Sequence, residues 1–190
     1  MCRPSTICAL AICIFLHGVS QFANAAVIFS ESFESPVVGA GGSTFALTAG
    51  WVNYSGPSTT RLISRPAGTS MFNSTGPLAS PASGSQLLVL QGTNSGVYRM
   101  SGSTILPDTV FTLSAALGNS LASTLDGDWS LQLWADANNN NQMDVGDSFL
   151  AQQFGSNGTA TNAAGGEWAL NSVSFDSGLN PSYNGMQLIV

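Results

Sequence analysis

Short runs of alternating apolar and polar residues predict that this chain is built almost entirely from β-strands. In residues 110–118, for example, Phe111 and Leu113 alternate with polar side chains, as in a strand with one buried face. Gly, Pro, Asn and Ser separate the runs, and helical periodicity is almost absent. The runs expected to form strands are 27–34, 50–54, 86–90, 96–100, 110–118, 129–135, 148–154, 167–175 and 186–190.

About nine short strands in one chain predict an all-β fold, specifically a jelly-roll-like antiparallel β-sandwich. One hydrophobic core is expected at this length, so residues 26–190 are interpreted as a single domain. The longest loops fall between residues 54 and 86, the part of such a fold that usually carries recognition.

The first 25 residues have the pattern of a cleavable secretory signal. Arg3 precedes the apolar run 7–19, and Ala23-Asn24-Ala25 forms the small-x-small cleavage pattern. The apolar run is shorter than the roughly 20 residues that a membrane-spanning helix needs, although an uncleaved anchor is the alternative. The sequence therefore predicts a secreted domain, extracellular or periplasmic, with no membrane span in the mature chain.

Cleavage would remove every cysteine and the only histidine, and the chain contains no lysine. Disulfides, zinc sites, Schiff bases and the Ser-His-Asp and Cys-His catalytic arrangements are then all excluded. Three arginines remain against ten carboxylates, so the domain cannot neutralise a row of phosphates. Nucleic acid is therefore excluded as a partner.

The strongest motif is a 12-residue stretch, 136–147, whose oxygen-bearing residues have the spacing of a calcium loop. These residues are Asp136, Asn138, Asn140, Gln142 (through its carbonyl), Asp144 and Asp147. Asn141 replaces the usual glycine at position 6, and strands flank the loop where an EF-hand has helices. We expect a structural Ca²⁺ here, with Asp136→Ala lowering stability only when calcium is present. The alternative is a polar hairpin tip.

A second metal ligand is considered at Glu34, which closes the first expected strand. There it would ligate a calcium between the sheets, or else be an exposed edge residue. The remaining carboxylates show no distinctive spacing and are expected to be solvated turn or edge acids. They are Glu31, Asp108, Asp126, Asp128, Glu167 and Asp176.

Aromatic side chains offer a possible ligand surface. Tyr54 and Trp134 are the candidates for stacking on a ligand, because Trp134 faces opposite the apolar Leu133 in its strand. Trp51 and Trp168 are expected to be core anchors instead.

The order of these motifs resembles that of exported bacterial carbohydrate-binding-like jelly rolls of the PEP-CTERM-associated type. It is also similar in organisation to the Stig (hapalindole-type) cyclases. In those relatives the resemblance implies a further C-terminal strand, which in the cyclases would carry a catalytic Asp. The sequence ends at Val190, so two alternatives are open: the sequence is a fragment that lacks this strand and a sorting tail, or the strand is truly missing and one sheet edge is exposed. The residues that carry the resemblance are Phe33-Glu34-Ser35-Pro36, Gly50-Trp51, 85–90, 105–113, 168–175 and 186–190.

The leading hypothesis for function is a secreted, non-catalytic, calcium-stabilised module that binds extracellular polysaccharide or matrix material. Enzymatic activity is left open, but the missing histidine, cysteine and lysine favour a binder. One alternative is a Stig-like calcium-dependent cyclase of isoprenoid-indole substrates. The other is a structural surface or biofilm protein.

Overall fold

The computed structural model describes residues 27–40, 42–54, 60–64, 84–90, 95–118, 128–155 and 168–190. The predicted signal peptide, Asp126 and Glu167 lie outside these ranges. Within the described ranges, no helix has the length and apolar character needed to cross a bilayer.

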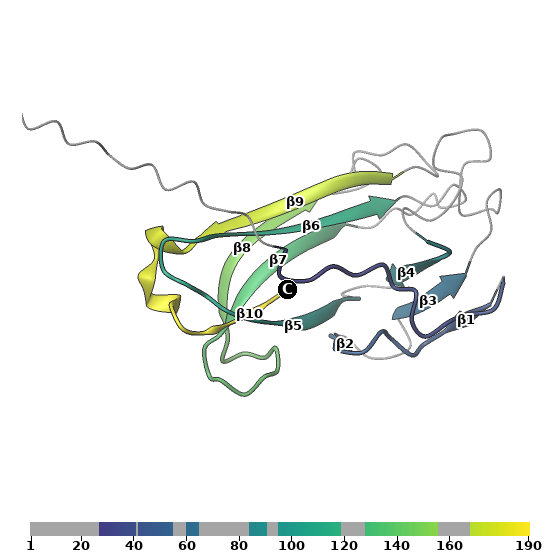
Figure 1. Cartoon of the computed structure of the whole chain (residues 1–190), viewed down its shortest axis with the longest axis horizontal. Coiled ribbons are helices and arrows are strands. Elements are labelled where there is room, and N and C mark those ends of the chain that lie inside the picture. Colours follow the sequence, from purple (N-terminus) through teal and green to yellow (C-terminus); the bar gives the residue numbers. More distant parts are fainter. Residues whose placement is uncertain are drawn as a thin grey trace, which may run out of the picture.

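Antiparallel strands make up the described fold, confirming the all-β sandwich (Figure 1). They form a five-stranded sheet of order β2-β5-β10-β7-β8, a two-stranded sheet β6-β9 and a three-stranded sheet β1-β3-β4. Two short 3₁₀ helices, η1 (Ser177–Leu179) and η2 (Pro181–Tyr183), join β9 to β10. The strands are β1 (Ser43–Thr44), β2 (Trp51–Asn53), β3 (Thr60–Ser64), β4 (Gln86–Leu90), β5 (Val97–Thr104), β6 (Val110–Gly118), β7 (Trp129–Asp136), β8 (Ser148–Gly155), β9 (Trp168–Asp176) and β10 (Gln187–Ile189).

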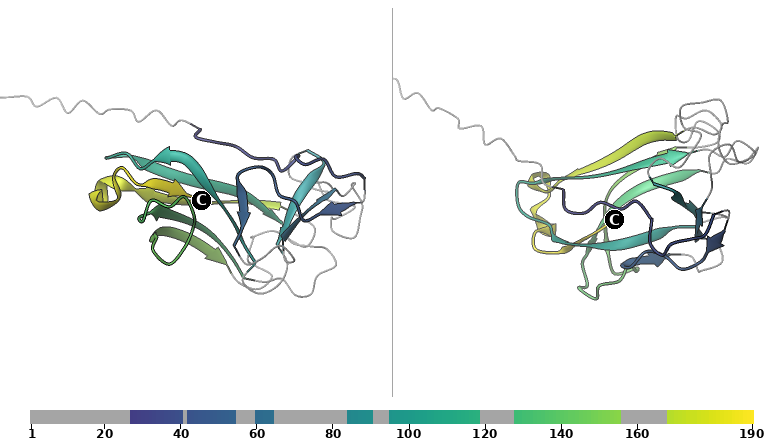
Figure 2. Two further views of the ribbon diagram at one scale, coloured as in Figure 1. Left: turned by 90° about the horizontal axis from the view of Figure 1, so that it is seen from below. Right: turned by 45° about the vertical axis from the view of Figure 1, so that its right-hand side comes forward.

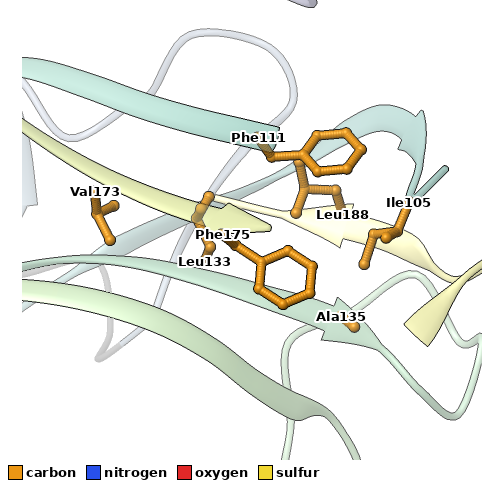
Figure 3. Close-up of a cluster of buried hydrophobic side chains, with 7 residues drawn as sticks. All are labelled: Ile105, Phe111, Leu133, Ala135, Val173, Phe175 and Leu188. Atoms are coloured by element: carbon orange, nitrogen blue, oxygen red, sulfur yellow. The ribbon is translucent and has the colours of Figure 1, made fainter. Parts of the chain in front are cut away.

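The core lies between the β6-β9 pair and the five-stranded sheet. Figures 1 and 2 show β6 and β9 as one layer over β5, β10, β7 and β8. Side chains from both layers meet in Figure 3 because alternate residues of each strand point inward. The buried cluster comprises Ile105, Phe111, Leu133, Ala135, Val173, Phe175 and Leu188.

The last strand, β10, occupies the middle of the five-stranded sheet. Gln187 pairs with Asp136 of β7 on one side and with Thr104 of β5 on the other. Leu188 is buried in the core cluster, and Ile189 is fully buried. The expected exposed edge is therefore not at this strand, since both of its edges are paired.

Most strand predictions are confirmed, two of them with the same bounds, β4 and β6. The strand expected at 27–34 is wrong, because these residues form no backbone ladder. Side chains hold this N-terminal segment instead, as described below. The strands β1 and β3 were not expected from the sequence.

Candidate functional site

A long loop joins β7 to β8 (Figure 1). Its backbone N–H groups surround the carboxylate of Asp136, the last residue of β7. Asp136 is only 1% exposed. Its Oδ1 accepts a hydrogen bond from the backbone N–H of Asn140 at 3.1 Å, and its Oδ2 accepts one from Asn141 at 2.9 Å. Asn139 and Asn141 adopt left-handed φ angles of 55° and 60°, so an asparagine does serve where calcium loops usually have glycine.

The carboxylate of Asp144 accepts hydrogen bonds from amide groups of the same loop. Its Oδ1 accepts from the N–H of Gly146 at 2.7 Å and from Asn138 Nδ2 at 2.9 Å, while its Oδ2 accepts from Asn140 Nδ2 at 2.6 Å. The backbone N–H of Gly146, followed by the Asn140 amide, holds the pKa of Asp144 below its ordinary value. The loop thus stabilises negative charge at an exposed position.

Asp147 closes the loop from the other end. Its Oδ2 accepts from the N–H of Asp144 at 2.8 Å, and its Oδ1 accepts from Ala137 at 3.2 Å. Gln142 donates its backbone N–H to Asn140 Oδ1 at 2.8 Å. Among the described residues, no three His, Cys, Asp or Glu side chains form a group ready to hold a metal ion. The predicted ligands share one loop, but the assignment of Ca²⁺ stays a prediction.

A side-chain contact ties this loop to the central strand of the sheet. Gln187 Nε2, at the start of β10, donates to Asn141 Oδ1 at 2.9 Å. Anything that rigidifies the loop therefore also supports the placement of β10 between β5 and β7.

Glu34, the second predicted metal ligand, anchors the N-terminal segment to the start of β4. Its Oε1 accepts from the backbone N–H groups of Ser85 and Gln86 at 2.9 and 2.8 Å, and its Oε2 accepts from Ser85 Oγ at 2.8 Å. Desolvation raises the pKa of Glu34, but the donors on Gln86 and Ser85 outweigh it and lower that pKa overall. These contacts give Glu34 a structural role, and its metal role stays a prediction.

The buried side chain of Gln86 completes this anchor. Its Nε2 donates to the carbonyls of Phe33 and Pro36 at 2.8 and 3.1 Å, and its Oε1 accepts from the N–H of Val38. The N-terminal segment is thus held by side-chain contacts with β4, which explains why it forms no ladder.

Gly84 is required by the close approach of Glu34. A Cβ at Gly84, which has a φ of +65°, would overlap Glu34 Oε1. At Gly102, which has a φ of +76°, a Cβ would meet nothing within 4 Å. We expect Gly102→Ala to cost ~1 kcal/mol for the left-handed backbone and Gly84→Ala ~2 kcal/mol, because Glu34 must also move. Urea unfolding of both variants measures the difference, and equal losses would contradict the anchoring role of Glu34.

The two predicted ligand-stacking residues, Tyr54 and Trp134, are not brought together. Trp134 is half-buried on β7, with its Nε1 donating to Gln132 Oε1 at 2.8 Å and its ring edge-on to Phe149 at 5.2 Å. Tyr54 is 59% exposed and follows β2, which β5 and β10 separate from β7. A shared binding platform is therefore not formed, and the ligand role of each residue stays a prediction.

A charged and aromatic cluster forms where the N-terminal segment crosses β2 and β5. Glu31 Oε2 lies 3.5 Å from Arg99 Nη1, with the two side chains 15% and 27% exposed. The Arg99 guanidinium also lies 5.2 Å from the centre of the Phe29 ring. Trp51 contacts Phe29 and Phe33 at ring-centre distances of 6.4 and 5.4 Å. Glu31 is thus not the solvated acid expected from the sequence, and Trp51 packs under the N-terminal segment.

Comparison with known proteins supplies the family. The model of the HpiC1 cyclase family matches residues 24–190. An apo cyclase from Fischerella sp. superposes with a TM-score of 0.59 at 17% identity, over 83% of this chain and 80% of that one. The Stig cyclase Fisc from Fischerella sp. TAU, solved with (3Z)-3-(1-methyl-2-pyrrolidinylidene)-3H-indole, gives the same values over 81% of its chain. No curated protein matches. At this identity the two structures show a shared fold.

These findings correct several expectations from the sequence. The similarity to the Stig cyclases is supported, whereas the carbohydrate-binding, PEP-CTERM-associated type is not. The non-catalytic module is contradicted as the leading function, since the matching family and the similar structures are cyclases. Polysaccharide is contradicted as the partner, because the similar cyclase was solved with a small indole compound. With its match over residues 24–190, the chain belongs to the HpiC1 cyclase family.

Proposed function

We propose that this chain is a calcium-dependent cyclase that acts on an isoprenoid-bearing indole. The observation that carries the proposal is the family match, which extends across every described strand. The indole compound bound to the similar Fisc cyclase supports an indole-bearing substrate. The antiparallel sandwich shared with that cyclase supports the same assignment.

The chemistry of such a cyclisation suits the residues that this chain retains. Closing an isoprenoid chain onto an indole conserves all atoms and passes through states with positive charge on carbon. It needs a proton donor and a water-excluding aromatic surface, but no covalent nucleophile. Beyond residue 25 the chain has no His, Cys or Lys, so carboxyl groups and tyrosines are its available proton donors. The composition that excludes Ser-His-Asp and Cys-His catalysis is therefore compatible with cyclisation.

Calcium would have a structural role in this enzyme. The oxygen-rich residues of the β7–β8 loop are the proposed ligands, and its left-handed asparagines give it the curvature of a calcium loop. A bound cation would neutralise the acids of the loop and rigidify its contact with β10 through Asn141 and Gln187. Glu34 would be a ligand of a second ion only if its bonds to Ser85 and Gln86 rearranged.

Cyclase activity can be tested on the full chain with a panel of prenylated indoles. We expect products of unchanged mass and new chromatographic retention in calcium, with most of this activity lost in EGTA. Circular dichroism in both buffers checks that the protein remains folded. A folded, calcium-loaded protein that converts none of the substrates would contradict the proposed function, and equal activity in EGTA would contradict the calcium dependence.

A further inference from the structure

We propose that the cluster of Glu31, Arg99, Phe29, Phe33 and Trp51 binds the indole ring of the substrate, with Glu31 accepting the indole N–H. The cluster joins the N-terminal segment, purple in Figure 1, to β2 and β5. This inference rests on the proposed cyclase function and assigns residues to it.

The aromatic side chains supply surfaces suited to a flat heterocycle. Trp51 meets Phe29 edge-on at 72° and Phe33 at a tilt of 46°. All three residues are half-buried, so part of each remains exposed to contact a ligand. Aromatic ligands bind favourably against rings in these offset and edge-on arrangements.

Glu31 retains hydrogen-bonding capacity at the same place. Its Oε1 accepts the N–H of Phe33 at 2.8 Å, but its Oε2 lies 3.5 Å from Arg99, longer than a charge-assisted hydrogen bond. A carboxylate oxygen can accept two hydrogen bonds, so Oε2 can take an indole N–H while Arg99 stays beside it. Arg99, held over Phe29, is then a positioning residue for the carboxylate.

A second observation points to a missing partner in this cluster. The Nε1 atom of Trp51 is buried and has no hydrogen-bond partner. A buried donor left unpaired is uncommon in folded proteins and costs free energy. The ring nitrogen of indole is a donor only, so the acceptor for this N–H would have to be an atom of the substrate outside its indole ring.

The charged pair is not needed to hold the N-terminal segment in place. Six hydrogen bonds already fix that segment to the start of β4, three accepted by the Glu34 side chain and three made by the Gln86 side chain. A partly buried ion pair adds little to stability, because desolvation offsets the Coulomb attraction. If Glu31 and Arg99 bind the substrate, their position among three aromatic rings is explained.

The test is a pair of NMR titrations of the full chain, one with indole and one with 1-methylindole, followed on the tryptophan N–H resonances. The two probes differ only at the ring nitrogen, which carries a hydrogen in indole and a methyl group in 1-methylindole. We expect the wild type to bind indole about tenfold more tightly, the value of one hydrogen bond to a charged acceptor. Glu31→Gln should remove most of this preference, because a neutral amide oxygen is a weaker acceptor. Asp128→Asn, which neutralises an exposed carboxylate elsewhere, should leave it unchanged.

Cyclase assays on the same variants separate this inference from the proposed function. Loss of the indole preference together with a fall in turnover in Glu31→Gln, at an unchanged melting temperature, supports the assignment. Unchanged preference and turnover in Glu31→Gln overturn the assignment but leave the cyclase function standing. A wild type that neither binds indole nor converts any substrate overturns both.

Discussion

Replacing Leu133 by alanine should lower the free energy of unfolding by about 3 kcal/mol. Leu133 is 1% exposed and lies on β7 in the cluster between the two layers (Figure 3). Truncation removes the apolar contacts of the side chain and leaves a cavity, because strands on both sides hold the neighbouring residues in place. Urea unfolding, followed by tryptophan fluorescence, measures the loss.

Leu170→Ala is the matched control for this variant. Leu170 lies on the outer face of β9 and is 75% exposed, so its truncation should change the free energy of unfolding by less than about 0.5 kcal/mol. If Leu133→Ala lowered the free energy of unfolding no more than Leu170→Ala, that result would contradict the packing of β6 and β9 on the five-stranded sheet.

Alternation along the strands made the sandwich predictable. In β6, Phe111 and Leu113 lie on the inner face while Thr112 and Ser114 are exposed, as the period of two requires. Opposite them on β9, Ser174 and Ser172 hydrogen-bond to these two hydroxyls at 2.8 and 2.7 Å. Both faces of this pair therefore follow directly from the order of residues.

The N-terminal segment shows where such a pattern misleads. Residues 27–34 are rich in apolar and aromatic side chains like a strand, yet the residues that hold them lie far away in the sequence. Glu34 bonds to Ser85 and Gln86, 51 and 52 residues further on, and Glu31 lies against Arg99. Contacts at such separation leave no periodic signal, so the site at Glu31 could not be found from spacing.

The prediction of function failed for a different physical reason. The expected loss of His and Cys with the signal peptide, together with the lack of Lys, argues against Ser-His-Asp and Cys-His catalysis, Schiff bases and ordinary zinc sites, but it does not exclude reactions that run through carbocations. Such reactions need carboxyl groups and aromatic surfaces, which are also ordinary parts of a β-sandwich. A sequence that supplies both cannot distinguish a binder from a cyclase by elimination.

The calcium loop was the most specific motif in the sequence, and the structure changes what is expected of Asp136. Asp136→Ala should now lower the free energy of unfolding by about 3 kcal/mol even in EGTA. The carboxylate is buried and accepts the N–H groups of Asn140 and Asn141 without any metal. Removing it leaves two backbone donors unpaired beside the end of β7, so calcium dependence of this variant is no longer a sufficient test of metal binding.

Asp144→Ala supplies that test, because Asp144 is exposed and its partners are the loop's own amides. Calcium at about a hundred times its dissociation constant should stabilise the wild type by ~3 kcal/mol. Asp144→Ala should lose most of this gain while unfolding nearly like the wild type in EGTA, whereas Asp136→Ala should be weakened in both buffers. Melting curves that are unchanged by calcium in the wild type would rule out the loop as a calcium site. A calcium effect that survives in Asp144→Ala would place the ion elsewhere, and Glu34 would then be the next ligand to replace.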